Sequence, residues 1–221
     1  MDWNGAMAAR HSVRKYADEP LTEGKLEQLR SEMEACNAES GLDIRLVTDD
    51  PRAFSGLAAK MTGFSGKPAY FAMVGTDSDD LDETAGYYGE RLVLFAQSIG
   101  LNTCWAATCS KKRTSESLKE GQRMVIGIAV GYGAEPGKPH KNRPLEEVMA
   151  GDSHPLWFLK GMEAVMLAPT ALNRQRFRFS LDGDKVRAEA AGGKLSHIDL
   201  GIVKFHFEKG CGLEKVEWSR V

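Results

Sequence analysis

The sequence has no long apolar run and almost no net charge. No segment of its 221 residues approaches the roughly eighteen consecutive apolar residues of a membrane-spanning helix. The 29 Lys and Arg residues nearly balance the 31 Asp and Glu residues, which leaves a net charge of −2. We therefore expect neither nucleic acid nor a membrane as a partner. Any anion site must come from a few positioned cations.

Cysteine is scarce, and its four copies are scattered without a CxxC pair: Cys36, Cys104, Cys109 and Cys211. This usage is typical of a reducing compartment, so we expect a cytoplasmic protein whose thiols are buried as small hydrophobes. The first ten residues also lack the basic region and apolar run of a signal peptide. A zinc site from Cys104, Cys109 and a histidine is disfavoured, because the spacing is unlike that of closed zinc sites.

The composition is that of an ordinary globular protein, with 42% apolar and 27% charged residues. Apolar periodicity predicts helices that end at Ala9 and Ile99 and others over 21–36, 157–167 and 198–209. Residues 76–86 read as an acidic loop before the helix that stops at Gly100. Strands are predicted within 42–50, 69–75, 101–109, 123–133 and 215–221, with a hairpin over 177–190.

The two ends of the sequence resemble each other. Residues 25–50 can be laid on residues 156–184, which pairs Met33-Glu34-Ala35 with Met162-Glu163-Ala164. The sequence of the predicted helix before Gly100 likewise aligns with that of the predicted helix before Gly210. Two amphipathic helix–strand units always look somewhat alike, but we favour a decayed internal duplication.

The first candidate motif is Arg10-His11-Ser12-Val13-Arg14. Two guanidinium groups with a hydroxyl between them can grip a phosphate through charge-assisted hydrogen bonds. Taken alone, a solvated basic turn explains this segment equally well.

The second motif is Lys141-Asn142-Arg143-Pro144, on a Gly- and Pro-rich loop after the strand that ends in Gly131-Tyr132-Gly133. Its two cations also suit a phosphate, although such segments are often plain surface loops. A dinucleotide-binding fold is rejected here, because Gly137 comes one place late and prolines break the segment where a helix should begin.

The third motif, residues 169–175, follows an apolar helix that Pro169 stops. Thr170, Asn173 and Gln175 then offer hydroxyl and amide groups, which suit the edge of a heteroaromatic ring such as the flavin pyrimidine. An ordinary helix-terminating turn remains the alternative.

The fourth motif, Gly100 to Ala107, places small residues after a helix. They allow a planar ligand to approach the backbone, whose N–H groups can act as donors. Trp105 either stacks on such a ligand or belongs to the core.

These four motifs, in this order, resemble the FMN-dependent nitroreductases, with their RxSxR segment, GLxTCW strand, GYG strand end, KxR-P loop and P-[ST]-x-x-N-x-Q motif. The resemblance covers nearly the whole chain. It implies an α+β fold, with a mixed, largely antiparallel sheet covered by helices, in two unequal pseudo-symmetric halves.

One motif stands in an unusual place. In most family members PSxxNxQ follows RxSxR by about a helix, but here that place reads Ala38-Glu39-Ser40-Gly41 and the motif lies at 169–175. The usual family member is a homodimer with FMN at the interface. This chain therefore resembles a dimer fused into one polypeptide, a monomer with a first half over 1–150 and a shortened second half over 151–221. One FMN site would remain, built from residues of both halves.

The resemblance assigns roles to residues of each motif. The phosphate would be held by Arg10, Lys141 and Arg143, with Ser12 in support. Arg14 would lie at the pyrimidine side of the ring, and Ala107-Thr108, where relatives often carry glycine, would narrow access to it. The full set expected at the cofactor is Arg10, His11, Ser12, Arg14, Cys104, Trp105, Ala106, Ala107, Lys141, Arg143, Pro169, Thr170, Ala171, Asn173 and Gln175.

The resemblance also implies a chemistry. The expected activity is hydride transfer from NADH or NADPH, through FMN, to small electron-poor substrates such as nitroaromatics and quinones, with ping-pong kinetics. The flavin carries the hydride, so no catalytic side chain and no metal is expected. The alternatives are a flavin-binding protein without turnover, such as a sensor or storage module, and a protein that has lost FMN.

Overall fold

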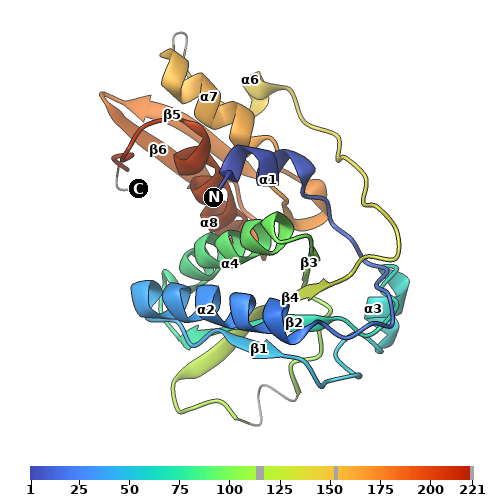
Figure 1. Cartoon of the computed structure of the whole chain (residues 1–221). Helices are drawn as coiled ribbons and strands as arrows, with labels where there is room; N and C mark the ends of the chain where they lie inside the picture. Colours follow the sequence, from blue (N-terminus) through green and yellow to red (C-terminus); the bar gives the residue numbers. More distant parts are fainter. Residues whose placement is uncertain (113–116, 152–153, 220–221) are drawn as a thin grey trace. The chain divides into compact units, whose positions relative to one another are not determined.

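The computed structural model describes residues 1–112, 117–151 and 154–219 (Figure 1). The chain divides into two compact units. Unit 1 consists of residues 1–8, 82–90 and 139–221, and unit 2 consists of residues 9–81 and 91–138. The division at residue 150 into two related halves stays a prediction.

Unit 2 is built on a four-stranded sheet in the order β1-β2-β4-β3. Its strands are β1 (Arg45–Val47), β2 (Ala69–Thr76), β3 (Asn102–Ala106) and β4 (Gln122–Gly131). Every neighbouring pair is antiparallel, and β2 and β4 change register between Met73 and Val74. The prediction of a largely antiparallel sheet accompanied by helices is confirmed.

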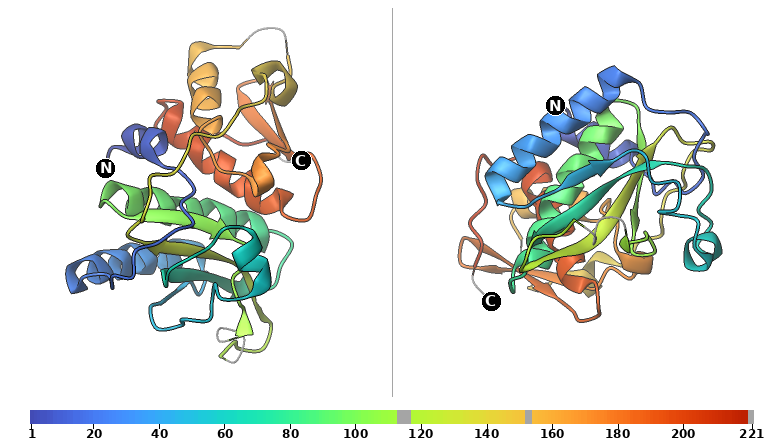
Figure 2. Two further views of the ribbon diagram at one scale, coloured as in Figure 1. Left: turned by 90° about the vertical axis from the view of Figure 1, so that its right-hand side faces the viewer. Right: turned by 90° about the horizontal axis from the view of Figure 1, so that it is seen from below.

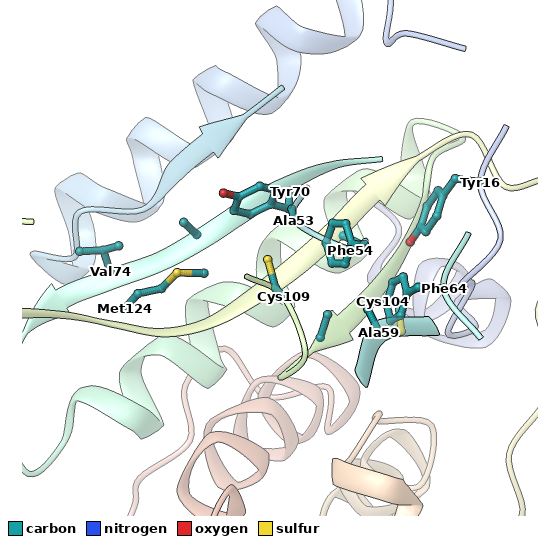
Figure 3. Close-up of a cluster of buried hydrophobic side chains, with 13 residues drawn as sticks. Tyr16, Ala53, Phe54, Ala59, Phe64, Tyr70, Val74, Cys104, Cys109 and Met124 are labelled. Carbon is teal, nitrogen blue, oxygen red and sulfur yellow. The ribbon is translucent and has the colours of Figure 1, made fainter. Parts of the chain in front are cut away.

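The central strand β2 is buried on both faces. Tyr70, Ala72 and Val74 point into a hydrophobic cluster that also contains Phe54 and Cys104 (Figure 3). Phe71 and Met73 alternate with them, point to the opposite face and are also fully buried. Covering on both faces explains why this strand reads as a continuous apolar run rather than an alternating one.

The helix α2 (Glu23–Ser40) runs four residues further than predicted and packs against β1. The Thr22 hydroxyl accepts a hydrogen bond from the Lys25 N–H at its start. Gly41 ends the helix in a left-handed conformation with φ 72°. A short helix, α3 (Leu57–Met61), was not predicted.

The helix α4 (Leu81–Ser98) begins inside the segment predicted to be an acidic loop, so that prediction was wrong for residues 81–86. Asp82 and Glu83 lie in its first turn, where the helix dipole favours carboxylates. Gly86 does not break the helix because the backbone of α8 approaches it closely: a Cβ there would lie 2.1 Å from the Ile198 oxygen.

Unit 1 contains the helices α1 (Trp3–Ala9), α7 (Leu156–Val165) and α8 (Ser196–Gly210), and part of α4. The predicted hairpin is β5 (Phe177–Asp182) and β6 (Lys185–Ala190), and α6 (Leu145–Val148) and the 3-10 helix η1 (Ala171–Asn173) complete the described elements. The helices α7 and α8 pack side by side (Figure 2). Phe158 and Phe179 both contact Phe207 of α8, with ring centroids 5.4 and 5.3 Å away.

The strand predicted at the C-terminus is wrong for the described residues, which end at Ser219. A single bridge joins Val186 to Trp218, whose indole N–H donates to the Glu208 carboxylate of α8 at 2.7 Å. Residues 220–221 of that predicted strand lie outside the described residues.

Within the described ranges, no helix has both the length and the apolar character needed to cross a membrane.

Candidate functional site

The RxSxR segment lies along the outer edge of β3 in unit 2. Ser12 bridges Thr103 in parallel, and the Val13 N–H donates to the Thr103 carbonyl at 3.0 Å. The Ser12 side chain hydrogen-bonds the Cys104 thiol group. Two of the predicted motifs, about ninety residues apart in sequence, therefore meet on one strand edge. We call Arg10, Ser12, Arg14 and Cys104 the arginine cluster.

Cys104 is a neutral thiol in this surrounding. Burial raises its pKa, and the Arg14 charge, the Ser12 hydrogen bond and the Arg10 charge oppose that rise without cancelling it. A thiol of this kind is a poor nucleophile.

The two arginines of the cluster differ in exposure. Arg10 is only 4% exposed, whereas Arg14 is exposed. Burying a guanidinium is costly unless its charge is paired or hydrogen-bonded.

The loop that leaves β4 runs back along the same segment. Tyr16 bridges Gly133, and the Ala134 N–H donates to the Lys15 carbonyl at 2.8 Å. Further on, Gly137 packs on His11 so closely that a Cβ at Gly137 would lie 2.3 Å from the His11 Cβ. Glycine is therefore required at 137 for close contact, not for a dinucleotide turn.

In unit 1 the KxR loop and the 169–175 segment are joined by hydrogen bonds. The Asn173 side-chain amide donates to the Lys141 carbonyl at 2.7 Å. The Gln175 amide accepts from the Arg143 N–H at 2.7 Å and donates to the Asn142 side chain at 3.1 Å. We call Lys141, Asn142, Arg143, Asn173 and Gln175 the loop cluster.

Gln175 is only 1% exposed, and both ends of its amide are used within the loop cluster. It was predicted to contact the cofactor. An amide engaged on both ends holds the KxR loop to the 169–175 segment, and contact of Gln175 with the cofactor stays a prediction.

The 169–175 segment has an unusual backbone. Leu172, Asn173 and Gln175 have φ values of 54°, 52° and 48°, in the left-handed region that residues other than glycine seldom adopt. The Asn173 N–H donates to the Thr170 carbonyl, and the Gln175 N–H donates to the Thr170 hydroxyl. Such conformations persist where the surroundings fix them, and they concentrate at functional sites.

Two residues of this region were missed by sequence reasoning. The Glu147 carboxylate accepts from Nε and Nη2 of Arg143 at 2.9 and 2.6 Å, on a side chain that is about half exposed. Asp199 accepts from the Ala171 N–H with both oxygens, at 2.9 and 3.1 Å. Glu147 follows Arg143 by four residues, a helical pairing distance that could have signalled it. Nothing in the sequence links Asp199 to Ala171.

The remaining predicted residues differ in exposure. In unit 2, Trp105 is partly exposed, Ala106 is buried and Ala107 lies exposed in the turn after β3. In unit 1, Pro169 is buried at the end of the α7 region. Among the described residues, no group of three or more His, Cys, Asp and Glu side chains is arranged to hold a metal ion.

Solved structures with the same fold are nitroreductases by their descriptions. A "putative nitroreductase" from Thermotoga maritima is 23% identical, with a TM-score of 0.69 over 95% of this chain and 83% of that one. A "putative nitroreductase in complex with FMN" from Desulfovibrio desulfuricans is 17% identical, with a TM-score of 0.56 over 70% and 99% of the two chains. An "FMN-dependent nitroreductase" from Clostridium difficile is 19% identical, with a TM-score of 0.50 over 62% and 91%.

A comparison with curated proteins gives no significant match. The family described as "Putative TM nitroreductase" matches residues 3–211, nearly the whole chain. Its span includes the arginine cluster, the loop cluster and the left-handed segment. On this match, the chain belongs to the nitroreductase family.

Proposed function

We propose that this chain binds one FMN and uses it to pass hydride from NADH or NADPH to small electron-poor acceptors such as nitroaromatics and quinones. Family membership gives the reaction class, and the similar structures from Desulfovibrio desulfuricans and Clostridium difficile are described with FMN. The observation that carries the proposal is the loop cluster, in which the KxR loop and the 169–175 segment are hydrogen-bonded together.

The donor groups fit a flavin that ends in one phosphate. Arg10, Lys141 and Arg143 are cations of the kind that binds phosphate oxygens, and the Ser12 hydroxyl adds a neutral donor. Lys141 is exposed and makes no ion pair with any described residue. Arg143 is paired to Glu147 on a half-exposed surface, where ion pairs are weak and a phosphate can replace the carboxylate.

The KxR loop follows directly in sequence on a residue that packs against the RxSxR segment. Gly137 packs on His11 of the arginine-cluster segment, and Lys141 follows Gly137 by only four residues. Four residues span at most about 14 Å.

A bound FMN would supply the hydride chemistry. The nicotinamide and the acceptor would react with it in turn, which predicts ping-pong kinetics. The side chains bind and tune it. Arg14 holds the pyrimidine side and favours the reduced, negatively charged ring. Thr170 and Asn173 would bond the ring edge and the backbone of 104–107 would border the ring, while Gln175 supports the loop.

The motif distribution supports a fused pseudo-dimer with one site per chain. RxSxR occurs once, near the N-terminus, and the P-T-x-x-N-x-Q segment occurs once, near the C-terminus. A monomer can therefore complete the site that the usual family member builds from two subunits.

The test is the visible spectrum of the FMN-loaded protein before and after NADH or NADPH is added under nitrogen. We expect the flavin absorption to bleach and then to return when a quinone is added. Bound flavin that neither nicotinamide bleaches would show a binding module without turnover. Failure to take up FMN at all would overturn the proposal.

A further inference from the structure

Asp199 anchors the left-handed segment from a separate helix. It lies in the first turn of α8 and is 5% exposed. Both carboxylate oxygens accept from the N–H of Ala171, the residue immediately before the left-handed Leu172. The bond crosses 28 residues, so it fixes the segment to an element outside it.

The helix that carries Asp199 is a rigid support. Gly201 lies so close to α4 that a Cβ there would be 1.9 Å from the Glu83 oxygen, and Gly210 would likewise meet Ala164 at 2.1 Å. Other bonds that hold the segment lie within it, such as Asn173 N–H to the Thr170 carbonyl, or reach the KxR loop through the Asn173 and Gln175 side chains. Asp199 thus ties a strained turn to a closely packed helix.

A buried carboxylate is expensive to retain. Burial raises the pKa of Asp199 to about 6, and the Ala171 N–H opposes that rise. The charged form is thus kept at neutral pH by little besides this one backbone donor. The buried Asp199 carboxylate is costly, and its hydrogen-bond donor is the N–H of Ala171 in the predicted cofactor segment. This arrangement indicates that the bond has a function in that segment.

We infer that Asp199 is a positioning residue for the FMN site proposed above: its carboxylate holds the 169–175 segment in the conformation that binds FMN, and protonation of Asp199 weakens FMN binding. This inference rests on the proposed function. A hydrogen bond to a charged acceptor is roughly twice as strong as one to a neutral acceptor. We expect about a fivefold difference in affinity between the two states.

Other charged groups on the elements packed against α8 are paired within unit 1. Glu83 and Glu90 of α4 bond Lys204 and His206 of α8, and the Glu208 carboxylate accepts from Tyr87 and Trp218. The segment itself carries Arg174, followed by Arg176, and Lys194 and His197 lie beside Asp199 in sequence. The FMN phosphate also titrates near pH 6, so a pH profile of the wild type alone is not decisive.

The experiment compares variants at each pH. FMN is titrated into apoprotein and followed by flavin fluorescence from pH 5 to pH 8, with wild type, Asp199→Asn and Asp199→Ala. Asp199→Asn keeps an acceptor for the Ala171 N–H but cannot ionise. Asp184→Asn, in the exposed turn of the β5–β6 hairpin, is the matched control for loss of a carboxylate.

The ratio of the Asp199→Asn and wild-type dissociation constants should fall from about 5 at pH 8 to about 1 at pH 5. The phosphate titrates in both samples and cancels from this ratio. Asp199→Ala should bind more weakly than Asp199→Asn at every pH, and Asp184→Asn should match the wild type. A ratio that stays constant, at 1 or any other value, would overturn the inference.

Hydrogen exchange separates this inference from the proposed function. Without ligand, at pH 7.5, the Ala171 amide should exchange faster in Asp199→Asn than in the wild type. If the wild type bound no FMN, the proposed function would fail. Equal exchange of the Ala171 amide in Asp199→Asn and the wild type would show, independently of FMN, that Asp199 does not anchor the segment. Binding of FMN by the wild type with equal affinity in Asp199→Asn would overturn the positioning role alone.

Discussion

The side-chain oxygen of Gln175 accepts the backbone N–H of Arg143 at 2.7 Å, across 32 residues. The same amide donates to Asn142. A glutamine that is 1% exposed thus fixes the loop that carries two candidate phosphate cations to the left-handed segment of the candidate ring site. The two motifs behave as one structural feature.

Replacing Gln175 should disturb both motifs. Gln175→Ala removes the acceptor of the Arg143 N–H, so the free energy of unfolding should fall by about 1 kcal/mol, and FMN binding should weaken with it. Gln175→Glu keeps the acceptor but loses the donor to Asn142, so its effect should be smaller. Urea denaturation and FMN titration of both variants provide the check. Wild-type stability and affinity in Gln175→Ala would show that the bond has no such role.

Arg14 should act on the flavin potential more than on flavin binding. In Arg14→Ala the loss of an exposed cation beside the ring should lower the FMN potential, while oxidised FMN binds nearly as before. Dye equilibration under nitrogen measures the potential. Lys15→Ala, which removes a neighbouring cation paired to Glu135, is the control. An unchanged potential in Arg14→Ala would place the ring elsewhere.

The ionised Asp199 carboxylate should lower the free energy of unfolding at neutral pH. Its pKa is about 6 in the folded chain against an ordinary 3.8, so the fold favours its protonated form. The stability from this group is fully present below about pH 4 and is lost as the pH rises through 6. At pH 8, Asp199→Asn should therefore unfold with a free energy higher by about 2–3 kcal/mol. The free energies of unfolding of the two proteins should converge at pH 4. Equal free energies at pH 8 would contradict the prediction that ionised Asp199 destabilises the fold.

One chain should hold one FMN. Each motif occurs once in the sequence, so a mirror site would lack either the cations or the ring-edge amides. Flavin released by heat can be measured against protein quantified by amino-acid analysis. Two flavins per chain, or one per pair of chains, would contradict the fused pseudo-dimer.

Most elements follow from local pattern. The burial of β2 on both faces is visible in its continuous apolar run, and the stop of α4 near Gly100 is visible in its periodicity. The early start of α4 was missed, because Gly86 reads as a loop residue until the backbone of α8 is seen against it. The C-terminal strand was over-predicted, because nothing local shows that Trp218 bonds Glu208.

The motifs of the candidate site were predicted from the sequence, but the residues that hold those motifs in place were not. The residue types of RxSxR, KxR and P-T-x-x-N-x-Q are visible in sequence, and their order indicates the family. The left-handed Leu172 and the Asp199 anchor are not, because both depend on contacts between distant segments. The double use of the Gln175 amide is likewise a property of the fold.

The most direct test of the account is a comparison of FMN with riboflavin, which lacks the phosphate. Apoprotein is titrated with each ligand and followed by flavin fluorescence. If Arg10, Lys141 and Arg143 hold the phosphate, riboflavin should bind at least about a hundredfold more weakly, because several charge-assisted bonds are lost. Equal affinity for FMN and riboflavin would contradict the central claim that these three cations form one phosphate site.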